Sequence, residues 1–453
     1  MLKLLTCLLL AAPLAAQANP FKWTLPFDEQ HSVTLRLFGS HRTRAELRTP
    51  AAYTSPDGPV KAIHLRTRLG LDANFPGNVN LLFEMQDVRF WGDTPRAASN
   101  TALGHGGTGI DVLQANLYTT NLLDLGVHAK LGRQRFVIGN QRLFSTLEWA
   151  PAPRAWDGLT LTRSFIGEEL QLFGMALLIN NLNAVKDDEW IFGGAVRWVP
   201  QFLPKSDLEA LFFYNHRDHP SGTQDANVAT ASLRFNGHFA LSEAIALIPT
   251  VEGIAQWGKS DPAFWGTPGE DDSHVAAFAA AVTLDMSMKL GAHELRIGAE
   301  YDYASGDSDP TDNRLQTFRA PFPFAHKYHG YADVIGWRNL HELAGRVTFT
   351  TPLGEWAESL RLEGAFHWFR RDNDDDGWYG ITGAVVRPGN EHQSVELGAE
   401  ADLLVFIKVN RWFNAEAGWA HYFAGRFVRS RDTAGNNRRK DMDFFYVQLQ
   451  LQF

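Results

Sequence analysis

Arginine side chains recur at alternate positions near the start of the chain. Arg42 and Arg44 are two residues apart, as are Arg66 and Arg68, and Arg36 shares the phase of the first pair. Alternate residues of an extended strand point to the same face, so each pair can present two guanidinium groups to one space. A guanidinium is planar, stays charged at physiological pH and binds a carboxylate through two parallel hydrogen bonds. This spacing favours recognition of anionic groups at several sites in series.

A second candidate site is acidic. The stretch Asp-Asn-Asp-Asp-Asp-Gly contains Asp372, Asp374 and Asp376 and matches the first part of a calcium-binding loop. Carboxylates at alternate positions can converge on one hard cation, and the glycine allows the sharp turn that follows. The position that should supply a bidentate Glu is Gly383, so the full motif fails. The stretch is either a calcium site in an outer loop or a solvated acidic loop, and no other cofactor is predicted.

The strands that would position these residues are easiest to recognise in the C-terminal segment. Its alternate residues are apolar at Phe445, Val447, Leu449, Leu451 and Phe453, and polar or amphipathic in between. One face of this strand is therefore apolar and the other polar. A soluble edge strand of this kind would invite aggregation, whereas a strand between lipid and water requires the pattern. The segment predicts the terminal strand of a membrane β-barrel.

The N-terminal segment predicts export. Residues 1–18 combine a basic start, a short apolar run and the small-x-small pattern Ala16-Gln17-Ala18, which is typical of a secretory signal peptide; a buried N-terminal helix is the alternative. Cys7, the only cysteine, would leave with it, so no disulfide is expected. After residue 18 no apolar run reaches the ~20 residues of a membrane helix. Residues 19–453 are therefore expected to span the outer membrane of a Gram-negative cell as strands.

Eighteen segments of alternating character follow one another along the chain. Ten residues at ~3.3 Å each, tilted by about 40°, cover the ~25 Å apolar band of an outer membrane. Their connections alternate between tight and long, like the short periplasmic turns and long extracellular loops of such barrels. The sequence predicts one all-β domain, a transmembrane antiparallel β-barrel of about 18 strands. The expected strands are 32–44, 63–74, 79–90, 111–118, 125–136, 158–163, 168–179, 190–199, 206–215, 227–237, 246–257, 274–289, 293–303, 340–350, 359–370, 391–407, 413–423 and 443–453.

The polar face of these strands is rich in charge. An arginine facing lipid at the bilayer midplane costs ~2–4 kcal/mol, so such residues should line a water-filled lumen. Acidic candidates concentrate late in the chain, which would give the lumen a basic and an acidic wall. These charges either meet a solute or pair with wall partners such as Asp72 and Glu84. The basic candidates are Arg36, Arg42, Arg44, Arg66, Arg68, Lys130, Arg296 and Arg361.

One connection is unusually long and aromatic. Ala304 to Asn339 spans 36 residues and is rich in Phe, Pro, His and Tyr. A loop of this length in a compact protein is usually functional or disordered. Two alternatives remain open, a constriction folded into the pore mouth and an ordered cap on the surface.

Three sequence blocks resemble the alginate export family of outer-membrane proteins. The first contains Gly132-Arg-Gln and Gly139-Asn-Gln-Arg-Leu143, followed by Asp157-Gly158. The second is Ser305-Gly-Asp307 with the aromatic residues after it, and the third is 417–425. The resemblance covers residues 32–453. It implies an 18-stranded barrel and, for the best-understood members, an arginine-lined conduit for a polyuronate.

These observations predict a channel for a hydrophilic, anionic solute, with an alginate-like uronate or another carbohydrate as the leading class. A general or differently selective porin is the alternative. A barrel-borne enzyme is less favoured, because G-x-S-x-G, H-E-x-x-H and phosphate-binding motifs are missing from the sequence. The expected partners are the solute, outer-membrane lipid, lipopolysaccharide and the barrel assembly machinery. The formal net charge of −9 argues against nucleic acid.

Overall fold

Eighteen long strands form the molecule. The computed structural model describes residues 21–49, 59–92, 109–165, 169–180, 188–203, 205–219, 224–267, 272–389, 394–430 and 441–453. The predicted signal peptide, residues 1–18, lies outside these ranges. The long strands are β2 Ser32–Thr49, β3 Val60–Asn74, β4 Asn80–Gly92, β5 Gly109–Leu122, β6 Val127–Gln134, β7 Trp156–Phe165, β8 Leu170–Asn180, β9 Asp188–Trp198, β10 Asp207–Arg217, β11 Ala226–Asn236, β13 Ile245–Ser260, β14 Ser273–Leu290, β15 His293–Ala304, β17 Leu340–Pro352, β18 Ser359–Arg370, β21 Glu396–Lys408, β22 Phe413–Ala424 and β23 Met442–Gln452.

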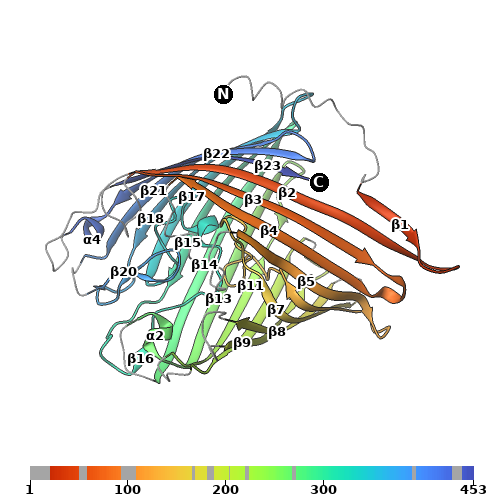
Figure 1. The fold of residues 1–453 in the computed structure, drawn as a ribbon. Helices are drawn as coiled ribbons and strands as arrows, with labels where there is room; N and C mark the ends of the chain where they lie inside the picture. The colour runs from red at the N-terminus through yellow and green to blue at the C-terminus, as the bar shows by residue number, and fades with distance from the viewer. Residues whose placement is uncertain are drawn as a thin grey trace.

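Each long strand is antiparallel to the next, and β23 pairs with β2, so the sheet closes into a barrel (Figure 1). The fold therefore confirms the predicted 18-stranded antiparallel barrel. Helix is confined to single turns, and no helix in the described ranges has the length and hydropathy needed to cross a membrane. The remaining short elements are β1 Lys22–Pro26, η1 Pro76–Asn78, β12 Phe239–Ala240, α2 Pro262–Trp265, β16 Arg314–Leu315, α3 Ala325–Tyr328, β19 Trp378–Tyr379, β20 Val385–Arg387 and α4 Arg426–Arg429.

The two faces of the wall differ as the alternation predicts. Leu69, Leu403 and Val447 expose more than half of their surface on the outside of the barrel. Their chain neighbours Arg68 and Asp402 point inward and are buried. Because a closed sheet satisfies its backbone groups and presents apolar side chains to lipid, the wall is suited to the outer membrane.

The barrel closes at a seam between β2 and β23. Arg42 is paired with Gln450 in the register of this seam. Beyond the last pair, Gly39 and Phe453 exchange two backbone hydrogen bonds of 3.1 and 3.0 Å. The same edge of β2 then pairs with β1, which the sequence did not predict. The rings of Phe21 and Phe453 meet there at 5.0 Å, so β1 and β23 lie end to end along one strand.

Some strand boundaries differ from the predicted ones. β5 runs from Gly109 to Leu122, beyond the predicted 111–118, and β21 begins at Glu396 rather than at 391. The predicted alternation of short turns and long connections holds in part of the chain: 291–292 joins β14 to β15, whereas 305–339 joins β15 to β17. From β8 to β13 it fails, because the four connections 181–187, 199–206, 218–225 and 237–244 are seven or eight residues long.

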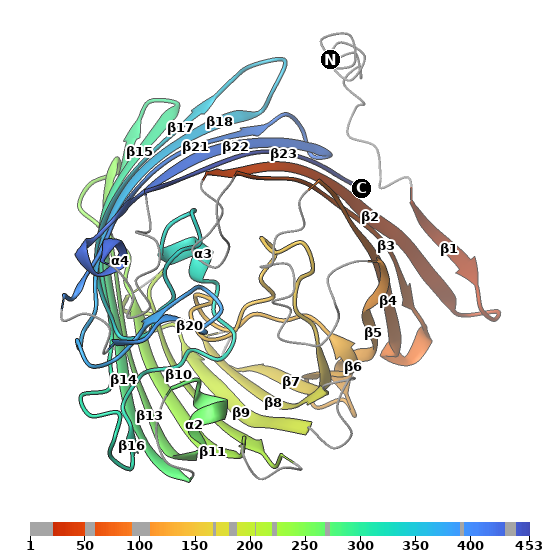
Figure 2. The same cartoon turned by 60° about the vertical axis from the view of Figure 1, so that its left-hand side comes forward.

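Two long connections fold into the barrel instead of away from it (Figure 2). We call residues 135–155, between β6 and β7, the first inner loop, and residues 305–339, which include β16 and α3, the second inner loop. Figure 2 looks into the barrel and shows α3 inside the ring of strands. The second inner loop was expected to be either a constriction or a surface cap. Its α3 segment lies within the lumen (Figure 2), whereas β16 pairs with the first residues of β14.

Candidate functional site

The paired arginines of β2 and β3 lie together on the inner wall. Register places Arg42 opposite Arg66, and Arg68 opposite Ser40 two positions further along. Arg42, Arg44, Arg66 and Arg68 are all buried, with at most 7% of their surface exposed. With Arg135 of the first inner loop they form a group that we call the arginine cluster.

The first inner loop covers the arginine cluster with backbone oxygens. Arg42 donates to the carbonyl of Glu148 at 2.7 Å and to that of Ala150 at 3.0 Å. Arg66 donates to the same two carbonyls at 3.0 and 3.1 Å. Arg44 donates to the carbonyl of Trp149 at 2.8 Å. Three consecutive carbonyls are therefore fixed by guanidinium groups of the wall.

The Glu148 carboxylate is the central anion of this arrangement. Its Oε2 atom lies 3.2 Å from Arg66 Nη2 and 3.0 Å from Arg68 Nη1. Its Oε1 atom accepts a hydrogen bond from Arg135. Charge-assisted hydrogen bonds of this type are about twice as strong as neutral ones. Three guanidinium groups thus hold one carboxylate, which is the chemistry that the arginine spacing predicts.

The arginine cluster keeps unused donors and positive charge. Within the described residues, the Nε atoms of Arg42, Arg66 and Arg68 and the Nη2 atom of Arg68 are buried without a hydrogen-bond acceptor. Of the carboxylates in the described part of the chain, the five guanidinium groups contact three, those of Glu46, Glu84 and Glu148. Burial and the nearby Arg68 lower the pKa of Arg135 to about 10, so it remains protonated at neutral pH. The cluster has the capacity to bind a further anion.

Trp149 connects the arginine cluster to the second inner loop. Arg44 stacks on its ring at 3.8 Å from the centroid. The ring also stacks on His326 at 3.8 Å, and its indole N–H donates to Asp333 at 3.2 Å. Stacking of a guanidinium on tryptophan is among the stronger cation–π contacts. Trp149 therefore lies between the basic wall and the neighbouring loop.

The two inner loops pair with each other through their backbones. Ser145 donates to the carbonyl of Phe322 at 2.9 Å, and Phe322 donates to that of Leu143 at 3.0 Å. The hydroxyl of Tyr328 donates to the carbonyl of Asn140 at 2.5 Å. These bonds satisfy backbone groups that would otherwise be buried without partners. The loops therefore form one unit inside the lumen.

Another part of the wall, on β15 and β21, is acidic, and it binds a guanidinium and a backbone amide of the loops. Arg142 of the first inner loop donates to Asp302 at 2.7 Å and also to Glu300, both on β15. Burial alone would lower the pKa of Arg142, but these carboxylates raise it above its ordinary value. The amide of Ala332 donates to Glu400 on β21 at 2.7 Å. The basic wall thus binds carbonyl and carboxylate oxygens of the loops, and the acidic wall binds a guanidinium and an amide.

The other predicted basic residues lie outside the arginine cluster. Arg36 pairs with Asp72 at 3.0 Å, one of the wall partners that the sequence suggested, and Lys130 is half-buried on β6. Arg296 pairs with Glu294 at 3.6 Å on β15. Arg361 stacks on Phe406 at 3.9 Å. These four residues belong to separate contacts, so the structure brings together only half of the predicted basic set.

The predicted calcium ligands do not converge on one point. Asp372 accepts hydrogen bonds from His341 and from the amide of Gly306 at 3.0 Å each. Asp376 accepts from Thr317 at 2.6 Å, among other donors, while Asp374 is exposed. Half-buried Asp372 and buried Asp376 therefore connect the segment after β18 to the second inner loop. Among the described residues, one other cluster has ligand atoms close enough for a metal ion.

Sequence reasoning missed the loop residues of the site. Arg142, Glu148 and Trp149 lie in a connection, where the strand alternation carries no information. Arg135 fell within the predicted strand 125–136, but β6 ends one residue before it. The one available signal was Arg142 between polar and apolar residues in Gly139-Asn-Gln-Arg-Leu143, one of the blocks that carry the family resemblance.

Comparisons with known proteins agree with this architecture. A family model described as "Alginate export" matches residues 33–441. OprD from Pseudomonas aeruginosa, an outer membrane protein, is 13% identical, with a TM-score of 0.55 over 92% of this chain and 93% of its own. OccAB1 from Acinetobacter baumannii is 11% identical, with a TM-score of 0.57 over 96% of this chain and 100% of its own. OccD3 (OpdP) from P. aeruginosa is 14% identical, with a TM-score of 0.56 over 92% of this chain and 91% of its own. At these identities the likeness shows the fold, and no curated protein matches the chain.

Proposed function

Because the chain belongs to the alginate export family, we propose that this outer-membrane channel passes hydrophilic solutes that carry carboxylates. Uronates and other acidic carbohydrates are the leading class. The observation that carries the proposal is the Glu148 carboxylate, which is bound by Arg66, Arg68 and Arg135. A solute carboxylate would meet the same donors.

The surrounding contacts suit an acidic sugar. The carbonyls of residues 148–150 accept hydrogen bonds from Arg42, Arg44 and Arg66, and sugar hydroxyl and ring oxygens are acceptors as well. Several weak sites in series favour conduction, because a solute must leave as readily as it enters. The fold is shared with OpdK of P. aeruginosa, which was solved with vanillate, an aromatic carboxylate.

In the proposed mechanism, the solute exchanges with the loop. The carboxylate enters along the basic wall and uses the buried guanidinium donors that have no acceptor among the described residues. It then replaces Glu148 on Arg66 and Arg68. The acidic part of the wall, on β15 and β21, repels the solute and keeps it on the basic side. Glu148 returns when the solute leaves, so binding remains reversible.

Two alternative functions, a general or differently selective porin and a barrel-borne enzyme, predict other properties of this site. In a general or differently selective porin, the arginines would only fix the first inner loop, and no solute would compete with Glu148. A barrel-borne enzyme would need a reactive group at the site. Of the solved structures with this fold, OprD is an outer membrane protein and another, from Pseudomonas fluorescens, is described as a BenF-like porin, which favours transport.

Planar-bilayer recording tests the proposal. We expect wild-type current to be blocked by an oligo-uronate and not by a neutral oligosaccharide of equal length. The double variant Arg66→Gln/Arg68→Gln should lose most of this block and shift its selectivity toward cations. Arg296→Gln is the matched control, because Arg296 shares the inward face but lies outside the arginine cluster.

The outcomes separate the alternatives. Current that oligo-uronate leaves unchanged in the wild type would indicate a general pore. A double variant that loses thermal stability but keeps its anion preference would assign the arginines to loop anchoring alone. Hydrolysis of glycan or lipid without conductance would favour the enzyme.

A further inference from the structure

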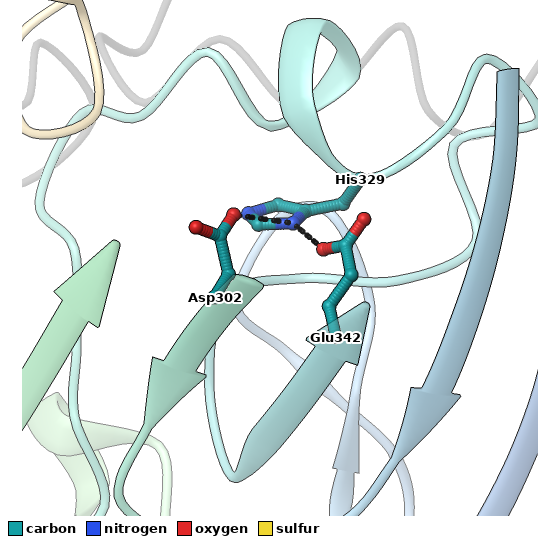
Figure 3. A group of neighbouring side chains, drawn as sticks. All are labelled: Asp302, His329 and Glu342. Carbon is teal, nitrogen blue, oxygen red and sulfur yellow. Dashed lines mark hydrogen bonds and ion pairs between the residues drawn. The ribbon is translucent and has the colours of Figure 1, made fainter. Parts of the chain in front are cut away.

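A histidine and two carboxylates converge on the acidic wall. Asp302 on β15 and Glu342 on β17 are directly opposite each other in the strand register. His329 follows α3 in the second inner loop, and its Nδ1 atom lies 2.5 Å from Glu342 and 3.8 Å from Asp302. Figure 3 shows both carboxylates pointing toward the imidazole ring. The three ligand atoms lie within 4.8 Å of one another.

This site has more negative charge than its cations match. Like charges directly opposite on neighbouring strands destabilise a sheet unless a cation lies between them. Glu300, Glu400 and Asp402 are buried on the same wall. Arg142 contacts Glu300 and Asp302, and His367 lies 2.6 Å from Glu342 and 3.4 Å from Asp402. Five carboxylates therefore share one guanidinium and the imidazoles of His329 and His367.

One oxygen of the site is left for a ligand. Arg142 uses the Oδ2 atom of Asp302. The Oδ1 atom of this fully buried residue accepts no hydrogen bond from any residue that the structure describes. A buried carboxylate oxygen without a partner is unfavourable, because nothing offsets the water that it has lost. A metal ion would supply the missing partner.

We propose that Asp302, His329 and Glu342 bind a divalent transition-metal cation, with Zn²⁺ as the best match. One imidazole and two carboxylates form a common donor set for Zn²⁺, and a water molecule can complete the tetrahedron. Ca²⁺ and Mg²⁺ prefer oxygen-only sites, so the imidazole disfavours them. The cation takes the place of the proton between His329 and Glu342, and that proton leaves to solvent.

The site would fix the second inner loop to the wall. Two ligands come from strands and the third from the loop that narrows the lumen. Gly330, next to His329, has a φ of +87°, and a Cβ there would lie 2.4 Å from a Glu400 oxygen. The chain therefore needs glycine at this position to bring His329 close to the carboxylates. A bound cation would hold this close approach.

Metal content tests the proposal. The full chain is refolded in detergent, stripped with EDTA, incubated with Zn²⁺ or Ca²⁺ and dialysed. We expect one equivalent of Zn²⁺ and no Ca²⁺ by mass spectrometry, with a higher temperature of unfolding in the zinc form. His329→Ala should retain no zinc. His326→Ala is the matched control, because His326 is a buried histidine of the same loop that contacts Asp333 instead.

Two results would overturn the proposal. If the wild-type barrel retains no zinc after dialysis, the three side chains are held together by hydrogen bonds without a metal ion. A His329→Ala barrel with wild-type zinc content would place the metal elsewhere. If His329→Ala does not refold, Co²⁺-loaded wild type decides: visible absorption typical of a four-coordinate ion supports the site, and an octahedral aqua-like spectrum contradicts it.

Discussion

A single carboxylate, Glu148, sets how much positive charge the basic wall leaves for a solute. It contacts three guanidinium groups and lies on a loop rather than on the wall. Glu148→Gln keeps the backbone carbonyls of the segment but removes the charge. We therefore expect a higher anion-to-cation permeability ratio and a stronger oligo-uronate block, opposite to the effect of replacing Arg66 and Arg68. Reversal potentials in a salt gradient measure the ratio, and an unchanged ratio would contradict this role.

At the same scale, sequence alternation placed individual side chains correctly on the wall. Leu69 faces out and Arg68 faces in, as their positions predict. The partners of the arginines could not be predicted, because Glu148 lies 82 residues from Arg66 and contacts it only after the barrel has formed. The side of the sheet to which a side chain points is a local property of the strand. The loop residue that a wall side chain contacts depends on the closed fold.

At the scale of elements, the inner loops are two connections that behave as one unit. Their pairing joins Phe144 to Phe322 as a parallel bridge, and Arg142 joins them to β15 across 160 residues of sequence. Strand pairs arise from local alternation, so the wall was predictable. The direction in which a long loop folds depends on distant charges, so the sequence left the second inner loop as either a constriction or a cap.

Replacing residues 140–150 by a Gly/Ser segment of equal length tests whether this unit limits flow. The replacement removes Arg142, Glu148 and Trp149 and leaves every strand intact. We expect a severalfold rise in single-channel conductance together with loss of the oligo-uronate block. A folded barrel with wild-type conductance would show that the limiting passage lies elsewhere.

The outer loop around Asp372 should respond to acid. Burial alone would raise the pKa of Asp372, but hydrogen bonds from His341 and the amide of Gly306 lower it below its ordinary value. Such a carboxyl stabilises the fold above its unfolded pKa, and the contribution is lost as the pH falls through the lowered value. We expect lower protection factors, which are exchange rates corrected for the pH dependence of unprotected amides, in residues 371–389 at about pH 3 than at about pH 6. Asp372→Asn should remove this difference, whereas Asp307→Asn, where burial raises the carboxyl pKa, should keep it.

At the scale of the whole molecule, stability depends on the seam. Gly39 faces outward on β2, and a Cβ there would lie 2.7 Å from both the Arg68 carbonyl and the Phe453 ring. Gly39→Val should therefore lower the temperature at which the folded barrel converts to its slower-migrating unfolded form in detergent gels. Gly345→Val is the control, because a Cβ at Gly345 has open space around it. Equal conversion temperatures would show that the seam does not limit stability.

The end-to-end arrangement of β1 and β23 has a consequence for the order of assembly. The strands that form the seam are almost a whole chain length apart, so their contact is the last that a growing sheet can make. Until then β2 has a free edge, and free edges recruit other chains. β1 pairs with Ser32–Arg36 from only a few residues away. A nascent barrel is thereby protected along part of its first strand before its last strand exists, and only the stretch from Ser40 to Thr49 waits for β23.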